Sequence, residues 1–183
     1  MKEEKGMELK PIFLKTYDTS ERVEVDKALP YVTKRGTVKT GNFIFYVQNG
    51  EHYAMMELEA EEVNLLAKAI DIAIADLYHN LNKEVRVFSI ERKDKEGKTE
   101  IIDVRTTEEN GFRIYIRHGD HWAMAHLDIT SASWLATVLS YEAIMEHVSI
   151  SNMQQAIWAE IKDQFTGKKK KKINYDPEEM MYG

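Results

Sequence analysis

Arginine and aromatic residues alternate along the segment RIYIRHGDHWAMAH at residues 113–126. The guanidinium groups of Arg113 and Arg117 can bind phosphate oxygens, and the rings of Tyr115 and Trp122 can stack on nucleic-acid bases. Because successive side chains of a strand point to opposite faces, these four residues share one face if the segment forms a hairpin. The segment therefore has the side chains needed to bind a single strand of nucleic acid.

A closely similar segment lies 69 residues earlier. FYVQNGEHYAM at 45–55 matches IYIRHGDHWAM at 114–124, and the match extends in register on both sides. Tyr46 and Tyr53 occupy the positions of the tyrosine and the tryptophan in the later copy. Self-similarity at a fixed spacing is typical of an internal repeat, so we expect both segments to have the same local structure.

Each copy has the pattern of a β-hairpin. The dipeptide Asn49-Gly50 is a strong signal for a type I′ turn, and this turn would pair Tyr46 with Tyr53. The same count pairs the equivalent residues of the second copy. The apolar residues that alternate with them, such as Phe45, point to the other face, which we expect a helix to cover.

The surrounding pattern supplies further strands and helices. Upstream of the hairpins, strands are expected at 9–17, about 30–41, 84–92 and 99–107. Residues 18–29 are expected to be a connection. Helices are expected at 59–80, at 132–148 with Thr130 or Ser131 as the N-cap, and at 151–165.

The predicted fold is α+β, with two tandem β-β-β-β-α repeats of antiparallel strands and a helix behind each sheet. The expected organisation is a first repeat at 7–80, a second repeat at 81–148, a C-terminal helix at 149–167, and a disordered Lys-rich, acidic tail at 168–183. The strands before the hairpins would add further cations to the open sheet faces. The predicted nucleic-acid-binding residues are Tyr46, Tyr53, Tyr115, Trp122, Arg113, Arg117, Lys34, Lys39 and Arg105.

Tandem units of this kind, with aromatic and basic residues on the open sheet face, resemble a group of single-stranded nucleic-acid binders. The group includes the Whirly proteins, the Pur-alpha repeats and the transcriptional positive cofactor four fold. The resemblance is one of architecture and covers about residues 7–148. It implies non-enzymatic binding of single-stranded nucleic acid across the sheet surfaces, with DNA favoured over RNA, often by a dimer or a larger assembly.

A protein–protein interaction module is the alternative function. Aromatic pairs stabilise sheets in their own right and can form a dimer interface. The C-terminal helix is amphipathic through Ile157, Trp158, Ile161 and Phe165, so it could join the sheet faces in a homo-oligomer or scaffold. The two functions differ in salt dependence, because phosphate binding weakens steeply with salt and apolar association does not.

The composition is that of a globular protein. Of the 183 residues, 43% are hydrophobic and 31% are charged, and no apolar run approaches the roughly 20 residues of a membrane span. The absence of cysteine and of an apolar N-terminal signal segment favours a cytoplasmic location. The net charge of −6 argues mildly against nucleic acid, although local fields decide binding. The acidic, aromatic end of the tail is a candidate surface for a protein partner.

No motif for a catalytic nucleophile, a phosphate-binding loop or a dinucleotide site occurs in the chain. His118, His121 and His126 are close in sequence, but strand alternation points two of them to opposite faces and the third lies in the turn. Three such side chains would not converge on a metal ion. We therefore expect no metal, no cofactor and no enzymatic activity.

Overall fold

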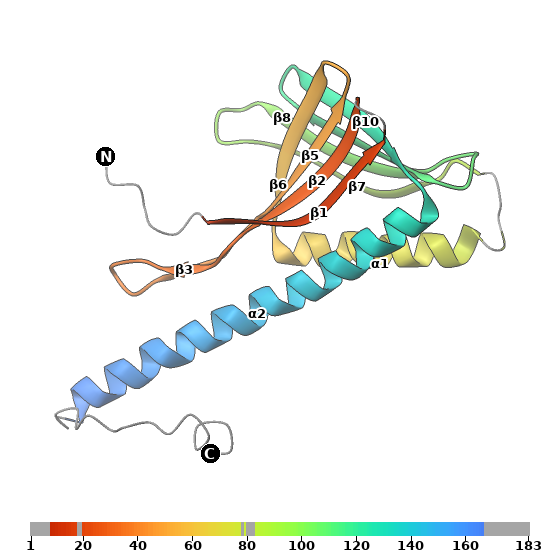
Figure 1. Cartoon of the computed structure of the whole chain (residues 1–183). Helices are drawn as coiled ribbons and strands as arrows, with labels where there is room; N and C mark the ends of the chain where they lie inside the picture. The colour runs from red at the N-terminus through yellow and green to blue at the C-terminus, as the bar shows by residue number, and fades with distance from the viewer. Residues whose placement is uncertain (1–7, 18–19, 78, 80–82, 167–183) are drawn as a thin grey trace.

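The computed structural model describes residues 8–17, 20–77, 79 and 83–166. Its architecture is α+β, as predicted, with two four-stranded antiparallel sheets and two helices (Figure 1). The tail predicted at 168–183 lies outside the described residues. None of the helices in the described part of the chain is long and apolar enough to cross a membrane.

The first half of the molecule consists of one sheet and the helix that follows it. Its strand order is β1–β2–β5–β6, with β1 at Leu9–Tyr17, β2 at Glu21–Ala28, β5 at Phe43–Asn49 and β6 at His52–Leu58. Helix α1 follows at Ala60–Leu77. The short strands β3 (Tyr31–Val32) and β4 (Val38–Lys39) form a separate hairpin between β2 and β5.

The second half also consists of one four-stranded sheet and the helix that follows it. Its strand order is β10–β9–β8–β7, with β7 at Arg86–Lys93, β8 at Thr99–Thr106, β9 at Phe112–His118 and β10 at His121–Leu127. Helix α2 spans Ile129–Phe165. The strands predicted at 84–92 and 99–107 are thus confirmed.

The predicted strand at 30–41 is wrong, because that segment forms the small β3–β4 hairpin. The strand that pairs with β5 is β2, which the sequence suggested to be part of a connection. Val23, Val25 and Lys27 alternate toward the core and are buried, which is the period-two pattern of a strand. A lysine at the third core position concealed this pattern.

The predicted separate C-terminal helix at 149–167 is also wrong, since α2 continues without a break to Phe165. No glycine or proline interrupts the segment, so nothing in its backbone chemistry ends the helix there. The N-cap is Asp128 rather than Thr130 or Ser131. Its carboxylate accepts a hydrogen bond from the Ser131 N–H at 2.6 Å.

The hairpin turns lie one residue later than predicted. Gly50 and Glu51 form the turn, Gly50 has φ 61°, and Tyr46 pairs with Met55 instead of Tyr53. Glycine with positive φ at the first turn position is typical of type II′ rather than type I′. The register is shifted by two residues, so every side chain keeps its predicted face.

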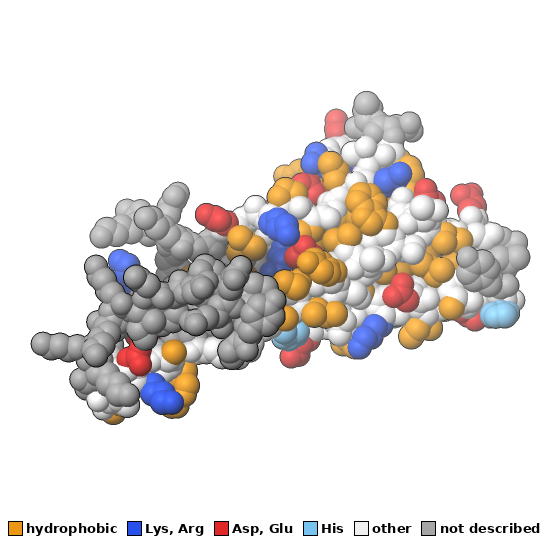
Figure 2. Space-filling model, turned by 60° about the horizontal axis from the view of Figure 1, so that its bottom comes forward, with side chains coloured by type: hydrophobic (Ala, Val, Ile, Leu, Met, Phe, Trp, Pro, Cys, Tyr) orange, Lys and Arg blue, Asp and Glu red, His pale blue; other side chains and the backbone are white. Residues whose placement is uncertain are grey.

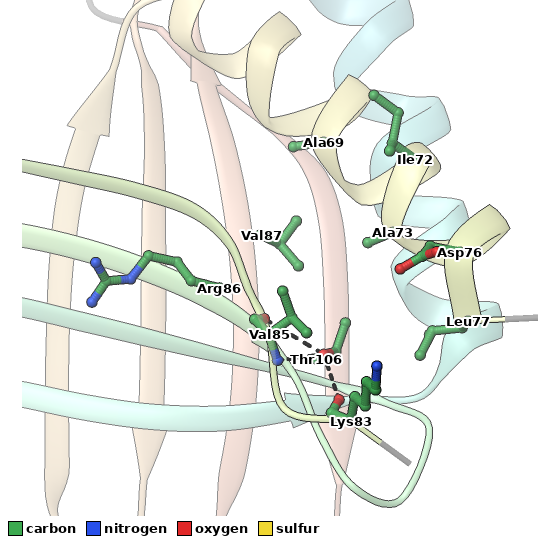
Figure 3. A pocket seen from close by; sticks show the side chains of 10 residues that line it. All are labelled: Ala69, Ile72, Ala73, Asp76, Leu77, Lys83, Val85, Arg86, Val87 and Thr106. Carbon is green, nitrogen blue, oxygen red and sulfur yellow. Dashed lines mark hydrogen bonds between the residues drawn. The ribbon is translucent and has the colours of Figure 1, made fainter. Parts of the chain in front are cut away.

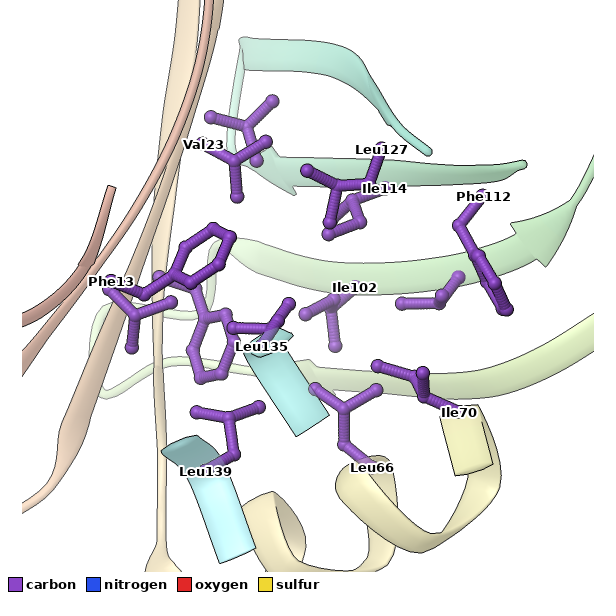
Figure 4. Packing of buried hydrophobic residues seen from close by; sticks show 14 of the residues in the cluster. Phe13, Val23, Leu66, Ile70, Ile102, Phe112, Ile114, Leu127, Leu135 and Leu139 are labelled. Atoms are coloured by element: carbon purple, nitrogen blue, oxygen red, sulfur yellow. The ribbon is translucent and has the colours of Figure 1, made fainter. Parts of the chain in front are cut away.

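Each helix packs against the sheet of the other half. Helix α1 contacts β7, and α2 contacts β1 and β4 and also β10 of its own half. The two helices cross and contact each other (Figure 1). In Figure 4, Leu66 and Ile70 of α1 lie beside Ile102 and Phe112 of the second sheet. The buried residues of both halves therefore form one continuous core.

The edge strand of each sheet crosses the strand ends of the other sheet. Strand β10 contacts β6, β5 and β2, and β6 contacts β9 and β8. The Asn49 side-chain amide donates to the Met124 carbonyl at 3.0 Å, and the Glu21 carboxylate accepts from the His126 backbone N–H. This arrangement leaves one face of each sheet uncovered by the helices. We call these the first and second open faces.

Candidate functional site

A row of basic side chains crosses the second open face. Arg86 pairs with Arg105 across β7 and β8, Arg105 pairs with Arg113 across β8 and β9, and Arg113 pairs with His126 across β9 and β10. Strands are about 4.8 Å apart, so this basic row is roughly 14 Å long. Four basic groups in a line can follow a chain of phosphates.

The aromatic side chains predicted for the second open face lie beside the basic row. Tyr115 and Trp122 are on the same face, at one and two pleats from Arg113. Trp122 is 44% exposed and lies directly opposite Arg117, which is also exposed. Arg117 Nε donates to the Gly119 carbonyl at 2.9 Å, which keeps the guanidinium at the sheet surface. The predicted placement of these residues on one face is confirmed.

Carboxylates hold most of the basic row in place. Arg105 Nε is 2.8 Å from Asp103, and Arg86 Nε is 3.1 Å from the same carboxylate. Glu84 lies 2.7 Å from Arg113 and 3.8 Å from Arg105. The hydrogen bond that Arg105 donates to Asp103 raises the pKa of the Arg105 guanidinium above its usual value. These acids relieve the repulsion between opposed arginines, and they also compete with any incoming anion.

The first open face carries aromatic side chains at the equivalent positions. The rings of Tyr46 and Tyr53 stack with centroids 6.4 Å apart, and Tyr53 is 49% exposed. The row equivalent to the basic row is different in charge: Asp26 pairs with Ile44, and Ile44 pairs with Glu57. The first open face therefore has the predicted stacking groups, but acidic and apolar residues replace the row of cations. Its arginine, Arg22, lies opposite Gln48 and is 2.8 Å from Glu24.

The repeated His-aromatic dipeptides meet where the two sheets cross. The ring of His52 stacks on Trp122 with centroids 4.4 Å apart, and His121 stacks on Tyr53 at 5.2 Å. The histidine of each half thus contacts the aromatic residue of the other half. Sequence reasoning missed this pairing, although the repeated His-aromatic dipeptide in both segments was a signal for it.

Two predicted phosphate-binding lysines lie away from both open faces. Lys34 is in the turn of the β3–β4 hairpin and Lys39 is on β4, a two-residue strand that contacts α2. Both side chains are exposed, but they belong to a separate two-stranded sheet. Of the nine predicted residues, the structure therefore gathers five on the second open face, two on the first and two on this hairpin.

The histidines near the second hairpin have three different sets of partners. His118 Nε2 is 2.7 Å from Asp94 and 3.6 Å from Glu100, while His121 stacks on Tyr53 and His126 Nδ1 is 3.0 Å from Glu21. The hydrogen bond from His118 lowers the pKa of Asp94, and backbone N–H groups of its turn add to this effect. The Asp94–Glu100–His118 group is the only trio among the described residues close enough to share a cation. Within this trio, His118 and Asp94 are joined by a hydrogen bond of 2.7 Å.

The contacts between helix and sheet differ between the halves. At the first sheet, Lys27 forms a buried ion pair with Glu146 of α2. Glu146 also accepts a hydrogen bond from the Gly41 N–H at 2.6 Å. At the second sheet, Thr106 of β8 and Leu77 of α1 occupy the equivalent positions. They line a cavity of about 370 Å³ between α1 and β7 (Figure 3). Sequence reasoning identified neither feature.

No protein-family model matches the chain, and neither the curated proteins nor the solved structures contain a match.

Proposed function

We propose that the chain binds single-stranded nucleic acid on the second open face, without catalysing a reaction. The observation that carries this proposal is the basic row of Arg86, Arg105, Arg113 and His126 beside two aromatic rings, the exposed Trp122 and the half-buried Tyr115. Phosphates would lie along the row, and bases would stack on Trp122 and Tyr115. We expect single-stranded DNA to be the preferred ligand and single-stranded RNA to bind more weakly.

The carboxylates of the basic row set the character of this binding. Glu84 and Asp103 already satisfy part of the charge of three arginines, so phosphates must displace or share these partners. The net gain per contact is then smaller than for free arginines. We expect moderate affinity that falls steeply as salt is raised, which also fits a chain with a net charge of −6.

The order of elements supports a wider proposal about kinship. We infer that the two halves are β-β-β-β-α repeats of the Whirly and Pur-alpha kind. Buried helix positions recur 69 residues apart, as in Leu66 and Leu135, or Ile70 and Leu139. The matched hairpin segments are separated by the same 69 residues.

Fluorescence anisotropy of a labelled oligo-dT tests the binding proposal. Intrinsic fluorescence is less specific, since Trp134 and Trp158 are also exposed. Removing one stacking ring should weaken binding by about 1–3 kcal/mol, or roughly 5- to 150-fold, in Trp122→Ala. Trp122→Phe should retain most of the affinity, and the matched Tyr53→Ala should lose much less.

Salt dependence separates this function from its rival. Affinity measured at about 50 and 200 mM salt should fall steeply if phosphates are bound. Absence of binding at the lower salt, or equal loss in Trp122→Ala and Tyr53→Ala, would overturn the assignment to the second open face. Oligo-U in place of oligo-dT measures the preference for DNA.

A further inference from the structure

The exposed surface of α2 lacks charge over most of its length. Between Ile129 and Ala159, the only acidic, lysine or arginine residues are Glu142 and Glu146, and both are buried against the first sheet. In the whole chain 31% of residues are charged, so this depletion is specific to the helix. Depletion of charge is a property of the central region of protein interfaces.

Large apolar side chains occupy this uncharged surface. Tyr141, Ile144 and Val148 are exposed on α2, on the side away from the core, and Leu65 and Ile72 are exposed on α1. Figure 2 looks at the molecule from the side of the helices, and hydrophobic side chains lie across that face. Large apolar side chains left exposed together on one face of a monomer are typical of an interaction surface.

The C-terminal part of α2 extends beyond the two sheets (Figure 1). It carries Trp158, which is 69% exposed, Ile161, and Phe165, which is 87% exposed. Short helices without tertiary contacts are marginal in water, because most helix stability comes from packing of an apolar face. This projecting segment therefore needs a partner for its apolar side chains.

We propose that α2 binds α2 of a second copy of this chain, with the two helices antiparallel about a twofold axis. In this arrangement the projecting Trp158–Phe165 segment of each copy covers the Tyr141–Val148 segment of the other. The surface is then self-complementary, as a twofold interface requires. Antiparallel helices also place their opposite dipole ends together.

The area agrees with a stable dimer. A Phe, Tyr or Trp side chain buries about 150–250 Å², so Tyr141, Trp158 and Phe165 from two copies bury on the order of 1,000 Å². The aliphatic side chains between them bring the total to the roughly 1,200 Å² at which specific interfaces begin. A membrane surface fits less well, because interfacial helices carry Lys and Arg on their polar face and α2 carries Ser, Thr, Asn and Gln there.

This dimer does not depend on nucleic-acid binding. The helices lie on the opposite side of the sheets from the open faces, so both open faces remain accessible in the assembly (Figure 1). Light scattering coupled to size-exclusion chromatography of the full chain should give about twice the chain mass of 21.3 kDa. A monomer at all concentrations would overturn the proposal.

Variants locate the interface. Ile144→Glu and Trp158→Glu place a charge in the apolar contact, so each should raise the dimer dissociation constant at least about 30-fold, as loss of a hot-spot residue does. Both side chains are exposed in one copy, so the thermal unfolding of the monomer should be retained. The matched control is Leu14→Glu, an exposed leucine on β1 that should leave the dimer intact.

Three results would assign the surface to another occupant. Dissociation by Leu14→Glu but not by Ile144→Glu would place the dimer contact on the sheets. Dimerisation of only the chain truncated after Thr166 would show that residues 167–183 cover α2 in the full chain. Co-sedimentation of the full chain with anionic vesicles, lost in Trp158→Glu, would show a lipid surface as the partner. Each of these outcomes contradicts pairing of two α2 helices in the full chain.

Discussion

The two open faces carry the same aromatic positions and opposite charge. Tyr46 and Tyr53 on the first face correspond to Tyr115 and Trp122 on the second. The row beside them is Asp26, Ile44 and Glu57 on the first face, but Arg105, Arg113 and His126 on the second. Both sheets thus have aromatic residues at these two positions, while the charge of the row beside them distinguishes one open face from the other.

The two sheets also differ in their contacts with the helices that cover them. At the first sheet the contact with α2 contains the buried Lys27–Glu146 ion pair, and β4 also contacts α2. At the second sheet a cavity lies beside Thr106. A buried ion pair is stable only while both partners are present. The contact between the first sheet and α2 thus depends on a buried ion pair, whereas the charges of the second sheet lie on its open face.

The largest expected effect comes from breaking the buried pair. Lys27→Met leaves the Glu146 carboxylate buried without a cation, which should lower the free energy of unfolding by about 3–5 kcal/mol. The double variant Lys27→Met/Glu146→Leu should recover most of this loss. The equivalent Thr106→Val removes one neutral hydrogen-bonding hydroxyl and should cost about 1 kcal/mol. Denaturant unfolding measures all three, and a stable Lys27→Met single variant would contradict the comparison.

Reversing the basic row should give the next largest effect. Arg105→Glu/Arg113→Glu removes two charge-assisted contacts of about 1.5–3 kcal/mol each, so affinity for oligo-dT should fall at least about 100-fold. The slope of log affinity against log salt should decrease by about 1.4, at 0.7 per lost contact with a single strand. Lys34→Glu/Lys39→Glu has the same change in charge on the β3–β4 hairpin. Equal losses in both double variants would show that net charge, and not the row, drives binding.

Asp26 and Glu57 form an acidic row on the first open face, and neutralising it should make the two open faces more alike. Asp26→Asn/Glu57→Gln removes two negative charges beside Tyr46 and Tyr53. A surface charge pair is worth about 1 kcal/mol or less in water, so affinity should rise about 2- to 5-fold. Anisotropy at low salt measures the gain. Unchanged affinity would show that the acidic row does not hold nucleic acid away from the first open face.

The smallest expected effect concerns the helix starts, which also differ. Asp128 accepts the Ser131 N–H at the start of α2, whereas at the start of α1 the Glu62 side chain accepts the Glu59 N–H at 3.0 Å. The hydrogen bond from Ser131 lowers the pKa of Asp128. Its contribution to stability is therefore present above the unfolded-state pKa of about 3.9 and is lost as the pH falls through the lower folded value.

The Asp128→Asn variant tests this pH dependence, because asparagine caps a helix without titrating. Between pH 5 and 3, wild type should lose up to about 1 kcal/mol more of its unfolding free energy than the variant does. Glu59→Gln is the control at α1, where the backbone of Glu59 and not its side chain makes the cap contact. Parallel pH profiles for wild type and Asp128→Asn would contradict the assignment.

Alternation made the open faces predictable. Side chains on a strand change face at every residue, so the predicted faces stayed correct although the turns were one residue too early and the register two residues off. The placement of Tyr115, Trp122 and Arg117 needed nothing beyond this local pattern. The strands of the second half were equally clear, because their apolar residues alternate without interruption by a buried charge.

Features that depend on distant partners could not be predicted in the same way. Lys27 looks like a surface residue until Glu146, 119 residues later, is placed beside it. The ion pair of Glu84 with Arg113 also requires the placement of the segment before β7 beside β9, which is not the next strand in the sequence. The start of the projecting segment of α2 resembles a linker because it is rich in Ser and Asn, and these residues continue a helix only in the absence of Gly or Pro.

The exchange of helices between the sheets has a consequence for how the chain folds and divides. Because α1 covers the second sheet and α2 covers the first, neither half can bury its own sheet face when it is alone. Unfolding should then be a single cooperative transition, without an intermediate in which one half is intact. A chain cut between Leu77 and Arg86 would give two fragments that are each unstable and fold only on association. We therefore expect that neither half folds as an independent domain.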